Sequence, residues 1–251
     1  MKIIQNLKKY TNLALDILFP EDIKCLLCGR ELDNDSMFCS HCLDLDIFNE
    51  GSRCIYCDSM VKDGNIVCTF CSENRHKFKK CVCPLNYNFL VRQAILKFKD
   101  DNAQYLARPF AKLVYERIKQ ENWQIDFIVP VPSYKKAIKK RGYNPALLLA
   151  NELSSLMNVP VYQVLSKNVP SPNQKFMDYS SRYKNLQYTM RLESKDFIKD
   201  KNILIVDDVI TTGATIDACA NLLGKAKAIY GCGVARTCLL YTSDAADDLT
   251  R

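Results

Sequence analysis

The stretch ILIVDDVITTGAT, residues 203–215, decides the fold. Its apolar and β-branched start, Ile203–Val206, predicts a strand that is buried on both faces. Two adjacent carboxylates, Asp207 and Asp208, end the strand, and a Thr-Thr-Gly turn leads into a predicted helix over residues 214–223. Backbone N–H groups, threonine hydroxyls and the helix dipole then converge on one anion. Because the carboxylates are placed for sugar hydroxyls, or for a Mg²⁺ ion that carries them, the stretch predicts a ribose 5-phosphate site.

The alternative is an ordinary strand–turn–helix in which aspartate and threonine serve as helix caps. A cap requires one such side chain, whereas this stretch holds several, and the ligand site is therefore favoured. The residues predicted to contact the ligand are Asp207, Asp208, Thr211, Thr212, Gly213, Ala214 and Thr215.

Thirteen cysteines in 251 residues are the other unusual feature of the chain. Residues 1–20 contain asparagine and lysine where a signal peptide would be apolar, so they predict a short amphipathic helix that ends at Pro20. No run is apolar and long enough for a membrane span, and no stable membrane insertion is expected. We therefore expect a cytoplasmic protein whose cysteines bind metal rather than form disulfides. The net charge of +7 suits anionic ligands without identifying them.

Eight of the cysteines form a duplicated unit of two CxxC pairs. Each cysteine of the first unit lies 29 positions before its counterpart in the second. The predicted metal ligands are Cys25, Cys28, Cys39, Cys42, Cys54, Cys57, Cys68 and Cys71. Two CxxC knuckles complete a closed tetrahedral site, which predicts two structural zinc ions, and a redox role would not need four copies of the motif. Sequential pairing within each unit is favoured over a cross-braced arrangement.

Three further residues lie close to these motifs. His41 lies inside the second CxxC pair and is expected to be a solvated surface residue, although it could replace a cysteine as a ligand. Cys81 and Cys83 have the wrong spacing for a knuckle, and we expect them to be incidental thiols where the ribbon meets the next domain.

From about Pro84 the patterns of helix and strand alternate, which predicts an α/β domain with a parallel sheet and helices on both faces. The predicted helices are residues 89–98, 103–119 and 144–157, and the predicted strands are residues 125–131, 159–165, 203–206 and 228–235. In such sheets the ligand lies at the carboxyl ends of the strands. A second strand end, Val131, Pro132 and Ser133, precedes the basic stretch Tyr134–Arg141. That stretch is either a solvated face or a source of cations for pyrophosphate or nucleic acid.

Residues 203–215 resemble the signature of type I phosphoribosyltransferases, which bind phosphoribosyl pyrophosphate (PRPP). The order of the motifs narrows the resemblance to the ComF family of competence proteins over about residues 13–237. These motifs are the paired zinc knuckles, YNFLVRQAILKFK, DFIVPVP, RGYN, SRYKN, ILIVDDVITTGAT and GVART. The resemblance implies a double zinc ribbon joined to a phosphoribosyltransferase fold. It also implies a cytosolic bacterial protein that helps bring single-stranded DNA into the cell during natural transformation.

The domain organisation expected from this resemblance has four parts. They are an amphipathic helix over residues 1–24, a double zinc ribbon over 25–83, a phosphoribosyltransferase-like domain over 84–237 and a tail over 238–251. The tail, CLLYTSDAADDLTR, is similar to a translated transposon-type sequencing adapter, so we expect it to be foreign to the fold. A natural acidic tail is the alternative.

Family roles carry over by position. Asp207 and Asp208 would be the catalytic carboxylates that orient the sugar of PRPP, with Mg²⁺ on its pyrophosphate, and Val131, Pro132 and Ser133 would lie near that pyrophosphate. Other family motif positions are Lys97, Arg141, Asn144, Gln174, Arg182 and Asn185. Pro145 stands where the family often has glutamine, which weakens any ligand contact expected of that element.

The implied partners are PRPP, single-stranded DNA and a competence helicase or recombination mediator protein. The basic residues expected to bind nucleic acid are Lys97, Lys99, Lys135, Lys136, Lys139, Lys140 and Arg141, with base stacking on Phe78, Phe98, Tyr134 or Tyr143. One alternative is a metabolic phosphoribosyltransferase that makes a nucleotide from PRPP and an unknown acceptor, but no base-recognition element is evident. The other is a non-catalytic zinc-ribbon adaptor, which the intact ligand loop argues against.

Overall fold

The computed structural model describes residues 24–32, 36–62, 64–167, 183, 186, 188–193 and 198–237. The expected N-terminal helix up to residue 23, the tail after Thr237, and the positions Gln174, Arg182 and Asn185 lie outside these residues. The chain forms two compact units, residues 1–45 and 46–251. The boundary between the units falls inside the segment expected to form one double ribbon, so the two cysteine units lie on different sides of it.

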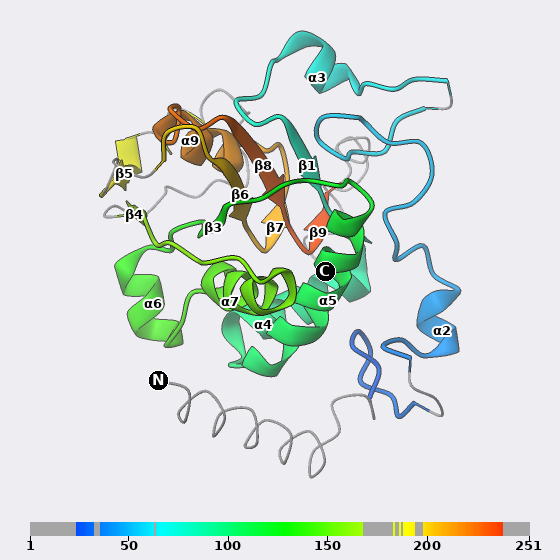
Figure 1. The fold of residues 1–251 in the computed structure, drawn as a ribbon. Coiled ribbons are helices and arrows are strands. Elements are labelled where there is room, and N and C mark those ends of the chain that lie inside the picture. The colour runs from blue at the N-terminus through cyan, green and yellow to red at the C-terminus, as the bar shows by residue number, and fades with distance from the viewer. Residues whose placement is uncertain are drawn as a thin grey trace. The chain divides into compact units, whose positions relative to one another are not determined.

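A four-stranded parallel sheet forms the centre of the second unit (Figure 1). Its order is β1 (Lys80–Val82), β8 (Ala228–Cys232), β6 (Asn202–Val206) and β3 (Phe127–Pro130). Strand β6 is hydrogen-bonded to neighbours on both sides, with Val206 beside Pro130 on one side and Cys232 on the other. Its apolar run is therefore buried, as the sequence predicts.

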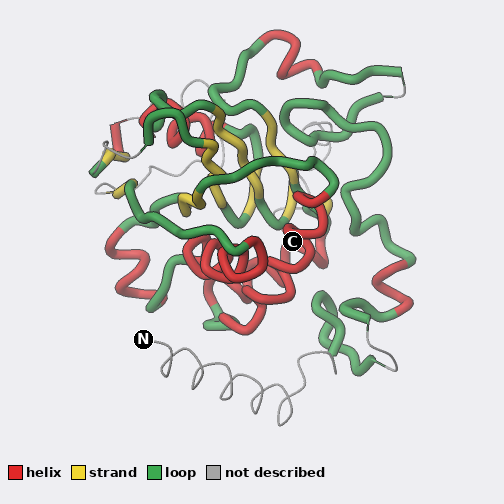
Figure 2. Tube along the Cα trace, viewed as in Figure 1, coloured by secondary structure: helices red, strands yellow, loops and turns green. Residues whose placement is uncertain are grey.

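Helices cover both faces of this sheet, which confirms the predicted architecture (Figure 2). The main helices are α4 (Phe89–Asp100), α5 (Ala107–Lys119), α7 (Pro145–Met157) and α9 (Ala214–Leu222). α5 and α7 pack against each other and lie with α4 on one side of the sheet, whereas α9 packs against β6 from the other side (Figure 1). The shorter helices are α2 (Ser40–Leu43), α3 (Thr69–Glu73), the 3-10 turn η1 (Gln104–Leu106) and α6 (Lys135–Arg141).

Local sequence signals set the starts and ends of the helices. The Asn88 side chain caps α4 by accepting a hydrogen bond from the Val91 N–H at 3.0 Å. Asn144 caps α7 in the same way, and Pro145 occupies the first helical position, where its missing N–H is not needed. Gly142 ends α6 in the left-handed conformation, with a φ of 89°.

Three strands of the sheet continue beyond a break into a second, smaller parallel sheet. Its order is β2 (Leu85–Asn86), β9 (Ala235–Arg236) and β7 (Val209–Ile210). The predicted single strand over 228–235 is thus divided into β8 and β9. Gly233 lies at this division, where an added Cβ would come within 2.9 Å of Ile210 Cγ1. The break between β6 and β7 contains Asp207 and Asp208, so the predicted turn after the carboxylates begins with a short strand.

The predicted strand over residues 159–165 is wrong as a regular element. It is reduced to a single bridge between Val161 and Ile128, in which the Pro160 carbonyl accepts from the Ile128 N–H. Pro160 has no N–H to donate, which limits pairing at this edge. The chain instead forms β4 (Leu165–Lys167), which pairs antiparallel with β5 (Met190–Leu192).

The second cysteine unit packs into the core of the larger compact unit, residues 46–251, which we call the main unit. Ile203 and Ile205 of β6 belong to the same buried cluster as Ile216 of α9 and as Cys57 and Cys71. This cluster fills the α9 side of the sheet, so the metal-ligand candidates of the second unit are part of the core rather than an appendage. Among the residues that the structure describes, no helix is long and apolar enough to cross a membrane.

Candidate functional site

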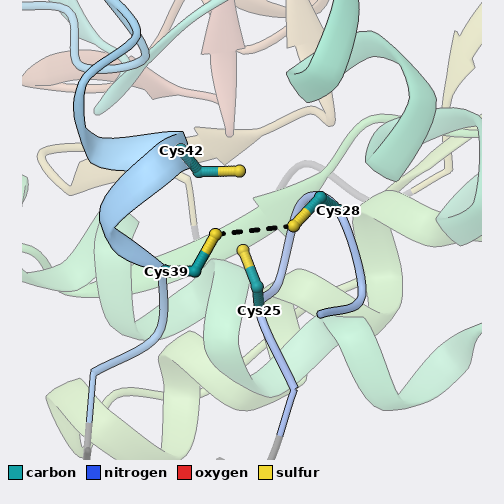
Figure 3. Close-up of side chains that lie close together, drawn as sticks. All are labelled: Cys25, Cys28, Cys39 and Cys42. Carbon is teal, nitrogen blue, oxygen red and sulfur yellow. Dashed lines mark hydrogen bonds between the residues drawn. The ribbon is translucent and has the colours of Figure 1, made fainter. Parts of the chain in front are cut away.

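The first cysteine unit brings four sulfur atoms together. Cys25 and Cys28 lie on a loop, Cys39 immediately precedes α2, and Cys42 lies within that helix. Figure 3 shows the four side chains turned toward one shared space, with Cys28 Sγ and Cys39 Sγ 3.5 Å apart. All four sulfurs lie within 4.8 Å of one another.

The second unit repeats this arrangement. Cys54 and Cys57 come from a loop, Cys68 is the N-cap of α3, and Cys71 lies within that helix. Cys57 Sγ and Cys68 Sγ are 3.7 Å apart, and again all four sulfurs lie within 4.8 Å of one another. The structure therefore groups the cysteines sequentially, which is the pairing that the sequence favours.

Both clusters fit a tetrahedral zinc ion. With Zn–S bonds of about 2.3 Å, tetrahedral geometry places the sulfurs about 3.8 Å apart, close to the distances found here. Four thiolates leave no open position, so a bound ion would be structural. His41 is exposed and belongs to neither group, and Cys81 and Cys83 are buried in the sheet region outside both groups.

Asp207 and Asp208 hold the break between β6 and β7 with their own side chains. Asp207 Oδ1 accepts the Asp208 N–H at 2.9 Å, and Asp208 Oδ1 accepts the Val209 N–H at 2.8 Å. Asp208 Oδ2 forms an ion pair of 2.8 Å with Lys99 Nζ from the last turn of α4. Lys99 therefore lies at the predicted sugar site, although the sequence grouped it with the nucleic-acid contacts.

Asp207 is a carboxyl held in a desolvated setting. Burial raises the pKa of Asp207 to about 6, while the positive charges of Lys99 and Lys167 oppose the shift. Burial also lowers the pKa of both lysines, and the Asp207 charge opposes that change. A ligand that offers hydroxyl donors or a cation to Asp207 would replace the hydration that its carboxylate lacks.

The turn after β7 forms a hollow at the end of α9. Residues that line it are Asp207, Val209, Ile210, Thr211, Gly213, Thr215 and Ile216. Thr211, Thr212 and Thr215 are half-buried, and Ala214 N–H lies 3.4 Å from Thr212 Oγ1. The structure thus brings the predicted carboxylate, hydroxyls and helix start to one place, and a helix N-terminus is the part of this arrangement that favours anions.

Gly213 is required by both its conformation and its surroundings. It caps α9 with a φ of 82°, a left-handed conformation that residues with a Cβ rarely adopt. An added Cβ would lie 3.1 Å from His76 Cε1 and 3.3 Å from the Phe78 ring. The turn that ends at Gly213 therefore packs directly on the segment that follows the second cysteine unit.

The second predicted strand end is held by Asn144. Its Oδ1 accepts the Ser133 hydroxyl at 2.9 Å, and its Nδ2 donates to the Val131 carbonyl at 3.0 Å. Pro132, which lies between Val131 and Ser133 in the sequence, is buried. Asn144 is itself buried, so its role in this structure is to fix the Val131–Ser133 loop to the start of α7.

The side chains of His76 and Asp217 form a buried pair beside Gly213 at the start of α9. His76 Nδ1 is 2.6 Å from Asp217 Oδ2, and the Lys77 N–H donates to Asp217 Oδ1 at 2.5 Å. Burial opposes protonation of the imidazole, but its interactions with Asp217 and Cys57 raise the pKa of His76 to about 9. His76 also stacks on Phe78, with ring centroids 4.2 Å apart.

The predicted nucleic-acid residues divide into exposed and engaged side chains. Lys97 and four lysines of α6 are exposed, whereas Arg141 forms a 3.0 Å ion pair with Asp100. The exposed α6 residues are Lys135, Lys136, Lys139 and Lys140.

The expectation of base stacking on three of the four aromatic residues is wrong. Phe78, Phe98 and Tyr143 are at most 7% exposed, because they pack in the core. Tyr134 is half-buried and is the remaining member of that set.

Sequence reasoning missed Lys167, His76 and Asp217, and it misassigned the surroundings of Lys99. Asp217 carried a signal, because it lies one helical turn after Gly213 in a predicted helix start. Lys167 and His76 are far away in the sequence, so no local pattern connects them with the loop.

The contrast between the two cysteine clusters gives a first prediction. We expect Cys57→Ser to lower the melting temperature of the main unit by about 5–10 °C, because the second cluster is part of its core. Cys28→Ser should leave that transition unchanged. Differential scanning calorimetry measures both variants, and elemental analysis should find about two zinc ions per wild-type chain. Equal effects of the two substitutions would contradict this distinction.

The shifted pKa of Asp207 predicts a pH dependence. In the unfolded chain an aspartate titrates near 4, whereas in the folded chain Asp207 titrates at about 6. The folded state therefore binds more protons in this interval, and this group's contribution to stability falls as pH rises from about 4 to about 6. We expect Asp207→Asn to remove this dependence and to raise the free energy of unfolding at pH 7 by about 1–2 kcal/mol. Urea unfolding across this pH range tests it, and an unchanged pH profile would contradict it.

Comparisons with known proteins agree with this geometry. A sequence model of the phosphoribosyl transferase domain matches residues 101–248. Competence protein F of Haemophilus influenzae is 30% identical over 179 residues, which cover 68% of this chain and 78% of that protein. Competence protein ComFC of Streptococcus pneumoniae is 27% identical over 82% of this chain and 96% of its own length. DNA utilization protein YhgH of Escherichia coli K12 is 24% identical over 79% of this chain and 83% of its own length.

The match to the family model includes the loop that carries Asp207 and Asp208. Two four-cysteine clusters precede a parallel-sheet domain, and the carboxylate-bearing loop lies at the carboxyl end of a central strand. The chain therefore belongs to the ComF family of competence proteins and carries a phosphoribosyl transferase domain.

Proposed function

We propose that this protein binds PRPP in the hollow at the end of β6 and acts in the cytoplasm on single-stranded DNA taken up during natural competence. The observation that carries the first part is the meeting of three groups at one strand end. These are the desolvated Asp207 carboxyl, the hydroxyl-rich turn Thr211–Thr212, and the N-terminus of α9. The second part is supported by the relatives, which are named for competence and for DNA utilization.

Each part of the hollow matches one part of PRPP. Backbone N–H groups at a helix start and threonine hydroxyls suit the 5-phosphate, which is an anion with many acceptor oxygens. Asp207 offers a carboxylate to the ribose hydroxyls, which would donate to it. Asp208 is already paired with Lys99, so the two carboxylates have different tasks: Asp207 faces the hollow and Asp208 fixes the strand break.

A transfer reaction would break the bond between the ribose C1 and the pyrophosphate. Mg²⁺, when bound with PRPP, supplies charge neutralisation for the leaving pyrophosphate. On this proposal Asp207 orients the sugar, Asp208 holds the loop, and neither acts as a base. The loop Val131–Ser133, anchored by Asn144, lies at the neighbouring strand end, where the pyrophosphate is expected.

Zinc is the proposed ion in both cysteine clusters, because four thiolates at these distances suit its preferred geometry. Its role would be structural. The exposed lysines of α6 are proposed as phosphate contacts for single-stranded DNA, since they present several positive charges on one short helix. We place Lys99 and Arg141 outside this set, because each is paired with a carboxylate.

Calorimetric titration with PRPP, with and without Mg²⁺, tests the ligand. We expect Asp207→Ala and Thr212→Ala each to weaken binding by roughly 10- to 100-fold, because a charged hydrogen bond contributes about 1.5–3 kcal/mol. The control is Asp126→Ala, since Asp126 precedes β3 at the opposite end of the same sheet and should not affect PRPP. Equal affinity in all of these proteins would place the ligand elsewhere. A search for pyrophosphate release then separates a transferase from a PRPP-binding protein.

The DNA contribution is tested by changing Lys135, Lys136, Lys139 and Lys140 to glutamine together. We expect weaker binding of single-stranded DNA and a flatter salt dependence, by about 0.7 in log–log slope for each phosphate that the variant no longer neutralises. A charge-matched control changes the exposed residues Lys199, Lys201, Lys225 and Lys227 at the other end of the sheet. If the first variant loses PRPP affinity and keeps its DNA affinity, the α6 lysines serve pyrophosphate alone.

A further inference from the structure

Hydrogen bonds join the segment that follows the second cysteine cluster to α9, the helix at the proposed anion site. Asp217 lies in the first turn of α9, is fully buried, and has His76 at 2.6 Å on one carboxylate oxygen. Its other oxygen accepts the Lys77 N–H at 2.5 Å. Residues 76 and 77 come directly after the second cysteine unit, so this contact connects segments that are 140 positions apart in the sequence.

The His76 ring also contacts the second cysteine unit. Its centroid lies 5.5 Å from that of the Phe70 ring, and Phe70 belongs to α3, next to Cys71 in the sequence. Metal-ligand side chains generally depend on the residues packed around them, which fix the orientation of the ligand. His76 therefore joins the helix that carries Cys71 to the first turn of α9 by a single side chain.

The buried guanidinium of Arg236 also lies close to this cluster. Arg236 of β9 is buried, and its Nε donates at 2.9 Å to the Ser59 hydroxyl, which also accepts from Cys57 Sγ at 3.3 Å. Both Nη atoms of Arg236 are buried without a hydrogen-bond partner among the described residues. Four thiolates around a divalent ion carry a net negative charge, which a buried guanidinium compensates. The second cluster is thus connected to β9 by Arg236 and to α9 by His76.

Packing reinforces the same connection. Gly213, the cap of α9, lies so close to His76 and Phe78 that an added Cβ would be 3.1 Å from one ring and 3.3 Å from the other. The turn that contains the threonines of the hollow therefore packs against His76 and Phe78, in the segment after Cys71. A shift of that segment would move the turn, because there is no spare space between them.

We propose that the second cluster, loaded with metal, positions the phosphate-binding turn through His76 and Asp217, and that the first cluster does not. The proposal rests on the PRPP site proposed above. His76 and Asp217 are positioning residues, since the hollow is lined by other side chains. Without the donors that hold it, the Asp217 carboxylate would be a buried negative charge beneath a site for an anionic phosphate.

Thermodynamic reciprocity gives the sharpest test. If metal at the second cluster strengthens PRPP binding, PRPP must strengthen metal binding there by the same factor, and coupling of this kind is typically about 5- to 150-fold. The Cys28→Ser variant keeps only the second site, so its zinc affinity can be measured by equilibrium competition with a zinc-selective dye. We expect PRPP to raise that affinity by several-fold. Cys57→Ser keeps the first site, whose zinc affinity should not respond to PRPP.

Point variants then test the link itself. We expect His76→Gln to weaken PRPP binding by about tenfold or more and to abolish the effect of PRPP on zinc affinity. The matched control is His41→Gln, because His41 is the chain's other histidine and is exposed in the first unit. In the His76→Gln background, Asp217→Asn removes the carboxylate that has lost its partner, so the double variant should recover a large part of the lost PRPP affinity.

Amide hydrogen exchange over residues 213–217 gives a readout that does not need PRPP. Exchange there should become faster in Cys57→Ser and in His76→Gln and stay unchanged in Cys28→Ser and His41→Gln. If zinc-loaded wild type fails to bind PRPP, the proposed function is contradicted, and the exchange data still decide whether the link exists. If the protein binds PRPP with an affinity that is the same in His76→Gln, and exchange is unchanged, the coupling is overturned and the proposed function stands.

Discussion

The pairing of β6 with both of its neighbours is the constraint on which the rest of the structure depends. Its backbone groups are hydrogen-bonded to β3 on one side and to β8 on the other, so the place where the strand stops is fixed from both edges. Asp207 follows at once, and its N–H continues the ladder by donating to the Cys232 carbonyl at 3.0 Å. The carboxylates are therefore set by the sheet, and the hollow forms where the regular ladder ends.

The same position has an energetic consequence. A carboxyl placed at the end of a central strand loses much of its hydration, and the two nearby lysines compensate only in part, so its pKa stays raised. A folded protein tolerates such a group when the surrounding elements are held firmly enough to prevent relaxation. Here α4 supplies Lys99 and the adjoining helix α9 is supported by His76 and Phe78.

The duplicated cysteine units illustrate how identical spacing can have different structural consequences. Both units place four sulfurs in the same geometry, because the CxxC turns and the short helices that follow are local structures. Their surroundings differ. Cys54, Cys57 and Cys71 belong to the core cluster on the α9 side of the sheet, whereas the first unit forms a compact unit of its own. The sequence repeat therefore predicts that the two units have the same sulfur geometry. It does not predict that only the second unit packs into the core of the α/β domain.

The sequence by itself determined the parallel α/β architecture and the carboxylate and hydroxyl loop after β6, and it favoured the sequential grouping of the eight cysteines that the structure has. Each of these follows from residues that are close together in the chain, such as a β-branched run, a glycine at a helix start or a CxxC turn. Tertiary structure alone decided that Pro160 breaks an expected edge strand, that Lys99 pairs with Asp208, that Phe78, Phe98 and Tyr143 are buried, and that His76 reaches Asp217. These features depend on contacts between distant segments. Their geometry is fixed only when the sheet brings those segments together, and no local periodicity carries that information.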